Sequence, residues 1–177
     1  MFLPGFNYTW IAEQEPRATL ICEFLAIPQG FDDLAILMLG GLTDAATTTR
    51  QLTIFFNEDF TASNYARASL WCAGTTAAGA SAQTSDVATL CSQAGLGAAD
   101  FRIWIPDYSN ASVIPIVQSM GVVPNHTSTA GHASVQYLQY HTQWVSTAAI
   151  ERIRFVVDTD EFAAPTKFIL YGVRYGS

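Results

Sequence analysis

Apolar and polar residues alternate along much of this chain with a period of two, most clearly in the segment 150–157. There, Ile153, Phe155 and Val157 fall on one side, and two arginines fall on the other. Successive side chains of a strand point to opposite faces, so this pattern predicts a strand with one buried face. After an acidic turn, residues 167–175 resume with aromatic and branched types that favour strands. The chain is therefore predicted to end in a hairpin that is tied into a sheet.

Short runs of similar character recur upstream. Asn, Asp, Gly and Pro stand between the runs, where their backbone preferences and side-chain hydrogen bonds favour turns. Regular short strands with almost no helix predict an all-β sandwich or barrel. Besides the two segments above, strands are expected at residues 18–25, 34–42, 51–56, 65–72, 101–105, 112–123 and 134–145, which gives about nine in total.

Residues 73–99 fit this pattern least well. They are rich in Ala, Gly, Ser and Thr, and a structureless loop of that length is unusual in a compact domain. Within them Val87, Leu90 and Ala94 recur at helical spacing, after a Ser-Asp pair that suits a helix start and before a glycine that suits a helix end. One short helix is expected here.

The N-terminal segment is apolar but irregular. Its aromatic and aliphatic residues are interrupted by Pro and Gly, which indicates an arm packed against a surface. That surface belongs either to the same chain or to a neighbouring subunit, and the sequence favours neither. Because 177 residues fit one domain, we expect residues 1–15 to form an arm and residues 16–177 a single domain. The residues expected to dock are Phe2, Leu3, Phe6, Tyr8 and Trp10.

Charged residues are scarce. They make up 13% of the chain, about half of the roughly 25% that is usual in globular proteins, and Lys167 is its single lysine. A soluble monomer normally covers its surface with charged side chains, so this deficit predicts that copies of the chain or other partners cover much of the surface. The alternative is a weakly charged monomer that its Ser and Thr residues keep in solution.

The formal net charge of -7 argues against binding to nucleic acid or to anionic membranes, because phosphate affinity comes from clustered Lys and Arg. No apolar run approaches the roughly 18 residues of a membrane span, and the first residues lack the pattern of a secretory signal. We therefore expect a soluble chain that is made in the cytosol and has no nucleic-acid or membrane partner.

No motif indicates catalysis or a cofactor. The sequence contains no nucleophile elbow and no glycine-rich phosphate loop, so we expect no enzyme activity. Cys22, Cys72 and Cys91 are widely spaced and are predicted to be free thiols. The acidic runs at residues 58–59 and 158–161 lack the ligand spacing of a calcium loop and are typical of exposed turns. No metal is expected either, because the spacing of the histidines matches no compact ligand pair: His126, His132 and His141.

Aromatic residues are the remaining candidates for a ligand site. Trp71, Trp104 and Trp144 lie in predicted strands, and exposed rings of this kind can stack against sugars. Aromatic side chains at strand positions more often pack in a core or between subunits. The sequence leaves both interpretations open and favours packing.

Several short blocks, taken together in their order and spacing over approximately residues 19–175, form a recognisable pattern. They are residues 24–34, 56–59, 63–65, 105–109, 147–150 and 170–173, with Trp144 and Ile153. In these blocks the chain resembles a diffuse group of small virion proteins of tailed bacteriophages that have a jelly-roll sandwich and serve as head decoration proteins or as minor tail and fibre components. The chain departs from the pattern at Glu58, where Gly is expected, and at residues 163–165, which replace a Gly-Ser step.

The resemblance implies a jelly-roll sandwich and a place in the virion, and it transfers no catalytic residue. We accordingly expect a capsid decoration protein that is assembled in the host cytoplasm, binds the major capsid protein or another virion protein on the outside of the head, and forms a homotrimer. The alternative is a receptor-binding or carbohydrate-binding module of a tail or fibre, with a host glycan as its ligand. An enzyme that acts on cell-wall or capsule sugars ranks last.

Overall fold

The computed structural model describes residues 5–17, 19–41, 49–73, 76–83, 89–94, 99–125, 134–158 and 161–176. These residues form twelve strands and one short 3-10 turn, η1, and contain no α-helix. No helix in these ranges is long and apolar enough to cross a membrane. The strands are β1 (Phe6–Gln14), β2 (Ile21–Phe24), β3 (Asp33–Gly40), β4 (Thr49–Phe56), β5 (Tyr65–Ala73), β6 (Thr76–Gln83), β7 (Thr89–Ala94), β8 (Ala99–Ile105), β9 (Ile116–Asn125), β10 (Ser134–Trp144), β11 (Ile153–Val157) and β12 (Lys167–Tyr175), with η1 at Ala62–Asn64.

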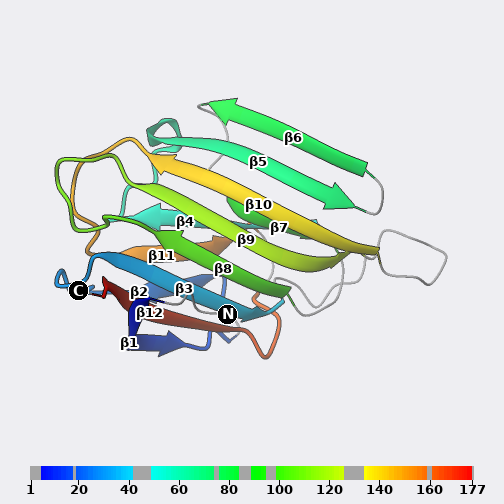
Figure 1. The fold of residues 1–177 in the computed structure, drawn as a ribbon. Helices are drawn as coiled ribbons and strands as arrows, with labels where there is room; N and C mark the ends of the chain where they lie inside the picture. Colours follow the sequence, from blue (N-terminus) through cyan, green and yellow to red (C-terminus); the bar gives the residue numbers. More distant parts are fainter. Residues whose placement is uncertain are drawn as a thin grey trace.

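The strands form two antiparallel sheets that lie face to face (Figure 1). The larger sheet has eight strands in the order β1-β12-β3-β8-β9-β10-β5-β6, and the smaller has four in the order β2-β11-β4-β7. The strand order β1-β12-β3-β8 in the larger sheet and β2-β11-β4-β7 in the smaller one is that of the double Greek key of a jelly roll. The predicted jelly-roll sandwich is confirmed.

Two hairpins extend this eight-stranded core. β5 and β6 are inserted between β4 and β7, and β9 and β10 are inserted between β8 and β11. Both hairpins join the larger sheet beyond β8, where β9 pairs with β8 and β10 pairs with β5. The larger sheet therefore extends beyond the smaller one on the side of β6.

Residues 73–99 differ from the sequence prediction. The predicted short helix is wrong, because Thr89–Ala94 forms strand β7, while Val87 lies outside the described residues. β7 pairs with β4 through a bulge: Leu52 is opposite Cys91, and Thr53 is opposite Thr89. A bulge adds one residue to a strand and interrupts the period of two, so the spacing in the sequence resembled that of a helix.

The N-terminal segment also belongs to the larger sheet. β1 pairs along its length with β12, with a bulge between Trp10 and Ala12. β1, β6 and β7 account for the excess over the nine strands expected from the sequence. β7 replaces the predicted helix, and β6 lies before it, where neither a strand nor a helix was predicted.

The core lies between the inner faces of the two sheets. Ile153, Phe155 and Val157 are all buried there, as their alternation predicts. Phe155 of the smaller sheet stacks on Phe168 of the larger sheet, with ring centroids 4.7 Å apart and an interplanar angle of 24°. Phe24 meets Phe155 edge to face at 6.4 Å. The contact between Phe155 and Phe168 joins the two sheets directly.

Replacing Phe155 with Ala should lower the free energy of unfolding by about 3–5 kcal/mol, because a buried ring is lost and a cavity remains. Urea denaturation followed by circular dichroism measures the change. Phe60→Ala is the matched control, since Phe60 is 49% exposed and its loss should cost less than half as much. Equal losses in the two variants would show that the Phe155 contact does not hold the sheets together.

Candidate interaction surface

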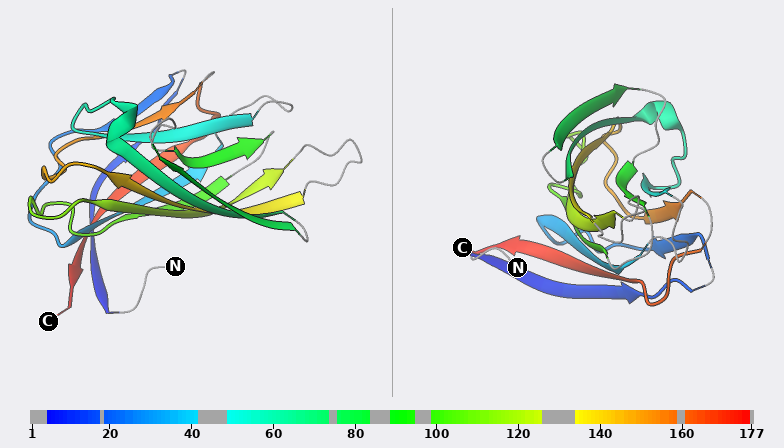
Figure 2. Two further views of the ribbon diagram at one scale, coloured as in Figure 1. Left: turned by 90° about the horizontal axis from the view of Figure 1, so that it is seen from above. Right: turned by 90° about the vertical axis from the view of Figure 1, so that its right-hand side faces the viewer.

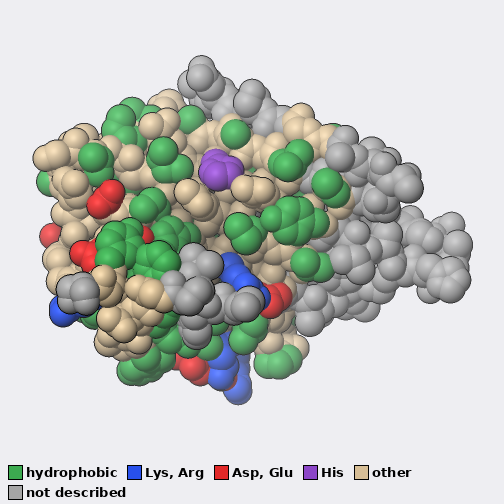
Figure 3. Space-filling model, in the orientation of Figure 1, with side chains coloured by type: hydrophobic (Ala, Val, Ile, Leu, Met, Phe, Trp, Pro, Cys, Tyr) green, Lys and Arg blue, Asp and Glu red, His purple; other side chains and the backbone are tan. Residues whose placement is uncertain are grey.

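The outer side of the eight-stranded sheet, which we call the front face, faces the viewer in Figure 3. Large apolar side chains are exposed along it at alternate strand positions, among polar and small ones. Strand register places them on one side: Val122 is opposite Tyr137 and Met120 is opposite Arg102. The exposed large apolar residues of the front face are Trp10, Leu39, Leu70, Ile116, Met120, Val122, Tyr137 and Tyr175.

Two groups of charged side chains on the front face are paired with charges of opposite sign. Asp100 and Arg102 approach each other to 3.9 Å in the middle of the sheet. At one end of β12, Lys167 Nζ lies 2.6 Å from a Glu13 carboxylate oxygen and 3.1 Å from one of Glu15. The hydrogen bonds to Glu13 and Glu15 raise the pKa of Lys167. A partner that covers this face would therefore meet charges that already have counter-ions.

The first half of β1 and the end of β12 form a ribbon that projects forward from the body of the sandwich (Figure 2). Phe6 packs edge to face against Trp104 of β8, at 5.8 Å, and against Tyr175, at 5.4 Å. Tyr8 contacts Trp104 in the same way at 6.3 Å. Trp10 is 60% exposed. The ribbon thus carries an aromatic cluster of Phe6, Tyr8 and Tyr175 against Trp104, and a separate tryptophan, Trp10, that is open to solvent.

The positions of Phe6, Tyr8 and Trp10 partly answer where the predicted docking arm packs. Phe6 and Tyr8 pack on the chain's own domain, which is one of the two alternatives that the sequence left open. Trp10 remains exposed and available for contact. Phe2 and Leu3 lie outside the described residues. A docking role for the arm therefore stays a prediction, with Trp10 as its best-placed residue.

Two aspartates hold the end of the ribbon, and sequence reasoning missed them. Asp33 is buried; its carboxylate accepts a hydrogen bond of 2.6 Å from the Tyr175 hydroxyl and one of 3.0 Å from the Asp107 backbone N–H. Asp32 accepts a hydrogen bond of 2.8 Å from the Tyr175 backbone N–H. The bond to Asp33 raises the pKa of the Tyr175 hydroxyl. The adjacent Asp pair before an apolar strand was the available signal.

The three tryptophans do not form one platform. Trp144 is only 3% exposed, on the inner side of β10, and its indole N–H donates to Asp59 at 2.8 Å, so its proposed role in stacking a ligand is wrong. Trp104 lies on the front face and is half-buried beneath Phe6 and Tyr8. The side chain of Trp71 lies outside the described part of the structure.

Asp59 is a structural hub. Its carboxylate accepts hydrogen bonds from the Trp144 indole, from the Asn64 side-chain amide at 2.8 Å and from the Thr61 backbone N–H at 3.1 Å. Burial alone would raise the pKa of Asp59, but the hydrogen bonds from Trp144, Asn64 and Thr61 outweigh burial and lower it. The ionised carboxylate therefore fastens the turn before β5 to the end of β10.

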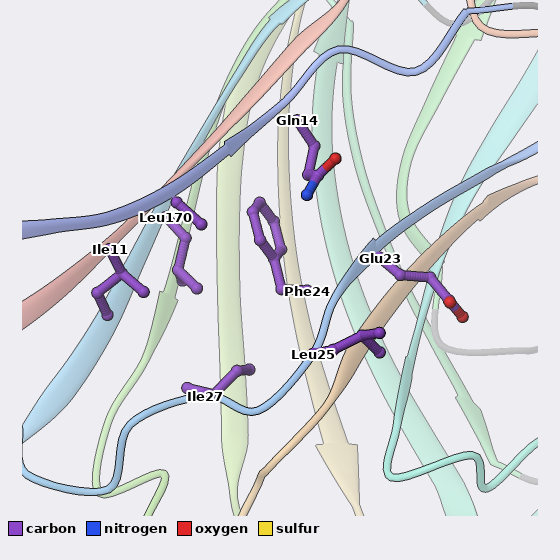
Figure 4. Close-up of a pocket in the computed structure, with 8 residues that line it drawn as sticks. Ile11, Gln14, Glu23, Phe24, Leu25, Ile27 and Leu170 are labelled. Atoms are coloured by element: carbon purple, nitrogen blue, oxygen red, sulfur yellow. The ribbon is translucent and has the colours of Figure 1, made fainter.

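A small pocket opens between β1 and β2, at one side of the sandwich (Figure 4). Its volume is about 230 Å³. Phe24, Leu170 and other apolar side chains form its walls, and the Glu23 carboxylate points away from it. That carboxylate instead pairs with Arg152 and Arg154 on the outer side of the smaller sheet. The pocket gathers no nucleophile, base or set of charges suited to catalysis.

The described residues contain no cluster of three or more His, Cys, Asp or Glu side chains that could hold a metal. His141 lies on the front face, 2.9 Å from the Gln139 amide, whereas His126 and His132 fall outside the described ranges. Cys22 and Cys72 are free thiols, and the side chain of Cys91 is not among those described. Burial, with a smaller contribution from Glu23, raises the pKa of Cys22 to about 12. This thiol is protonated and inert at neutral pH.

Replacing Asp59 with Asn should reduce stability at neutral pH and have less effect in acid. Because the folded-state pKa of Asp59 is lowered, its stabilisation is complete above the unfolded value of about 3.9 and is lost as the pH falls through the folded value. The difference in melting temperature between the wild-type chain and Asp59→Asn should therefore shrink as the pH falls below 4.

Trp144→Phe removes one of the donors to Asp59 together with part of a buried indole, so its melting-temperature difference should have a constant part from lost packing and a smaller part that shrinks in acid. Thermal melts across a pH series test both variants. If the difference in melting temperature between Asp59→Asn and the wild-type chain stays constant at every pH, the stabilising role of the ionised Asp59 carboxylate is contradicted.

Comparisons of the chain with protein-family models, with curated proteins and with solved structures found no match. The case for a function therefore rests on the chain's own surface and topology.

Proposed function

We propose that this chain is a structural virion protein that binds the outside of a phage head through its front face and reinforces the shell. The observation that carries the proposal is the front face itself, a broad sheet surface with exposed apolar side chains at alternate positions and with paired charges. Surfaces of this kind favour contact with protein, because apolar area is removed from water and few unpaired charges must be desolvated.

The fold supplies a rigid support for such a contact. Two sheets packed face to face resist bending, and the Phe155–Phe168 contact links them directly. A shell offers many equivalent positions, so a modest interface is repeated in every copy. If subunits are joined, attachment of several at once raises avidity without new contacts. A stiff, weakly charged subunit suits this role.

Topology and family resemblance support the same proposal. The strand orders β1-β12-β3-β8 and β2-β11-β4-β7 form a jelly roll, an architecture used by viral capsid domains and also by lectins. The sequence blocks described above resemble small phage virion proteins that serve as head decoration proteins or as minor tail and fibre components. A homo-oligomeric virion protein, without enzyme activity, is the function that agrees best with both.

A carbohydrate-binding module of a phage tail is the second candidate, and one observation favours it. The Trp10 ring is 60% exposed at a projecting edge, where a sugar could stack on it. A glycan array distinguishes the candidates: binding to a host polysaccharide that is lost in Trp10→Ala would favour the tail module. Immunogold labelling of particles would show where on the virion the chain lies. The leading proposal expects label spread over the head.

A charge placed in the middle of the front face should weaken binding to phage heads by at least about tenfold, because an unpaired charge would be buried in the contact. Met120→Glu tests this, and Ile21→Glu on the smaller sheet is the matched control, since the two side chains are 41% and 42% exposed. Co-sedimentation with heads that lack the chain measures binding. Equal binding by Met120→Glu and wild type would contradict the proposal.

Trp10→Ala should weaken head binding several-fold and should change the free energy of unfolding by less than about 1 kcal/mol, because this ring is exposed in the free chain. Leu25→Ala is the control, because Leu25 is 62% exposed on a different strand edge. Isothermal calorimetry and urea denaturation give the two quantities. Unchanged head binding in Trp10→Ala would remove this residue from the docking surface.

A further inference from the structure

β6 is the last strand of the eight-stranded sheet, and one of its edges faces away from the rest of the sheet (Figure 1). It pairs with β5 through eight consecutive residues, from Ala66 opposite Gln83 to Ala73 opposite Thr76, without a bulge. Within the ranges that the structure describes, no other strand pairs with it. β6 therefore presents a straight row of backbone donors and acceptors about 26 Å long.

The other sheet edges each carry a feature that hinders pairing. β1 has a bulge between Trp10 and Ala12, and its end is flanked by the ion pair of Glu13 with Lys167. β2 has only four residues. β7 has a bulge in its pairing with β4. Bulges, charges and short strands are the usual means by which proteins prevent edge-to-edge association.

β6 has none of these features. Its sequence, Thr-Ala-Ala-Gly-Ala-Ser-Ala-Gln, contains no charged residue and no proline, although the whole chain carries a net charge of -7. Among the atoms that the structure describes, a Cβ added at Gly79 would approach the Ser69 carbonyl oxygen, at 3.5 Å, which is ordinary van der Waals contact. Packing within the chain therefore does not require a glycine there.

The strand is also complementary to itself. When two copies pair antiparallel about a two-fold axis, Ala, Gly and Ser at its centre stand opposite Ala, Gly and Ser in every central register. Small uncharged residues bring neither steric clash nor charge repulsion when two identical strands approach. An identical copy is accordingly the partner that this edge fits best.

We infer that β6 pairs with β6 of a second copy, so that the chain forms a two-fold dimer with one continuous sheet. Antiparallel pairing of identical edges requires the two-fold axis to stand perpendicular to the sheet at β6, so the two β6 strands present the same side of the joined sheet. The dimer differs from the trimer expected from the family resemblance. It does not depend on the virion proposal, because self-association is measured without a shell.

Sedimentation equilibrium of the full chain, over a range of concentrations, tests the mass. We expect a dimer of twice 19.2 kDa. In Gly79→Lys the dimer dissociation constant should rise by at least about tenfold, because two ammonium groups are brought to the paired edge. Gly79→Ala is the matched control and should remain dimeric. A monomer, a trimer, or a dimer that Gly79→Lys leaves unchanged would overturn the inference.

Cysteine cross-linking tests the geometry, whether or not Gly79→Lys folds. Single cysteines are placed at residues 77 to 82 in a background with Cys72→Ser and Cys91→Ser. Only positions near a two-fold axis approach their own counterparts closely enough for a disulfide. We expect cross-linking to peak at one position and to fall on either side of it. Uniform cross-linking, or none, would overturn the pairing.

Discussion

The contact between Phe155 and Phe168 represents the constraint on which the rest of the structure depends: each sheet has one apolar face that must be covered by the other. Because β11 and β12 belong to different sheets, this contact closes the sandwich near the end of the chain. Once the inner faces are satisfied, the outer faces are free to vary. On the front face, the outer positions carry exposed apolar side chains and few charges.

The parts of the fold that the sequence predicted are those in which alternation is regular. A half-buried strand was correctly predicted from Ile153, Phe155 and Val157, because β11 pairs without a bulge and its alternation is uninterrupted. β7 was mistaken for a helix because its bulge interrupts that alternation. The interaction surface was harder to predict. Tryptophans in strands do not reveal which face they occupy, so Trp144 and Trp104 were grouped although they lie on opposite faces, and the link from Asp33 to Tyr175 joins residues far apart in sequence.

Charge and topology give the proposed roles a common physical basis. Arg102 and Lys167 have acidic neighbours, so the front face is close to electrically neutral before any partner arrives. The β6 edge is neutral by composition. Pairing at that edge would join the larger sheets of two copies into one continuous sheet. The proposed self-association and the proposed shell binding would thus use different parts of one sheet and would not compete.

The two inserted hairpins separate the parts of the molecule that can change from the parts that cannot. The jelly-roll strands close on themselves, whereas β5, β6, β9 and β10 are added to one side of a single sheet. Natural variants can therefore lengthen, shorten or replace the outermost hairpin while the strand order beneath it stays the same. For protein engineering, this makes the β5–β6 hairpin the natural site for grafting a foreign peptide onto the subunit.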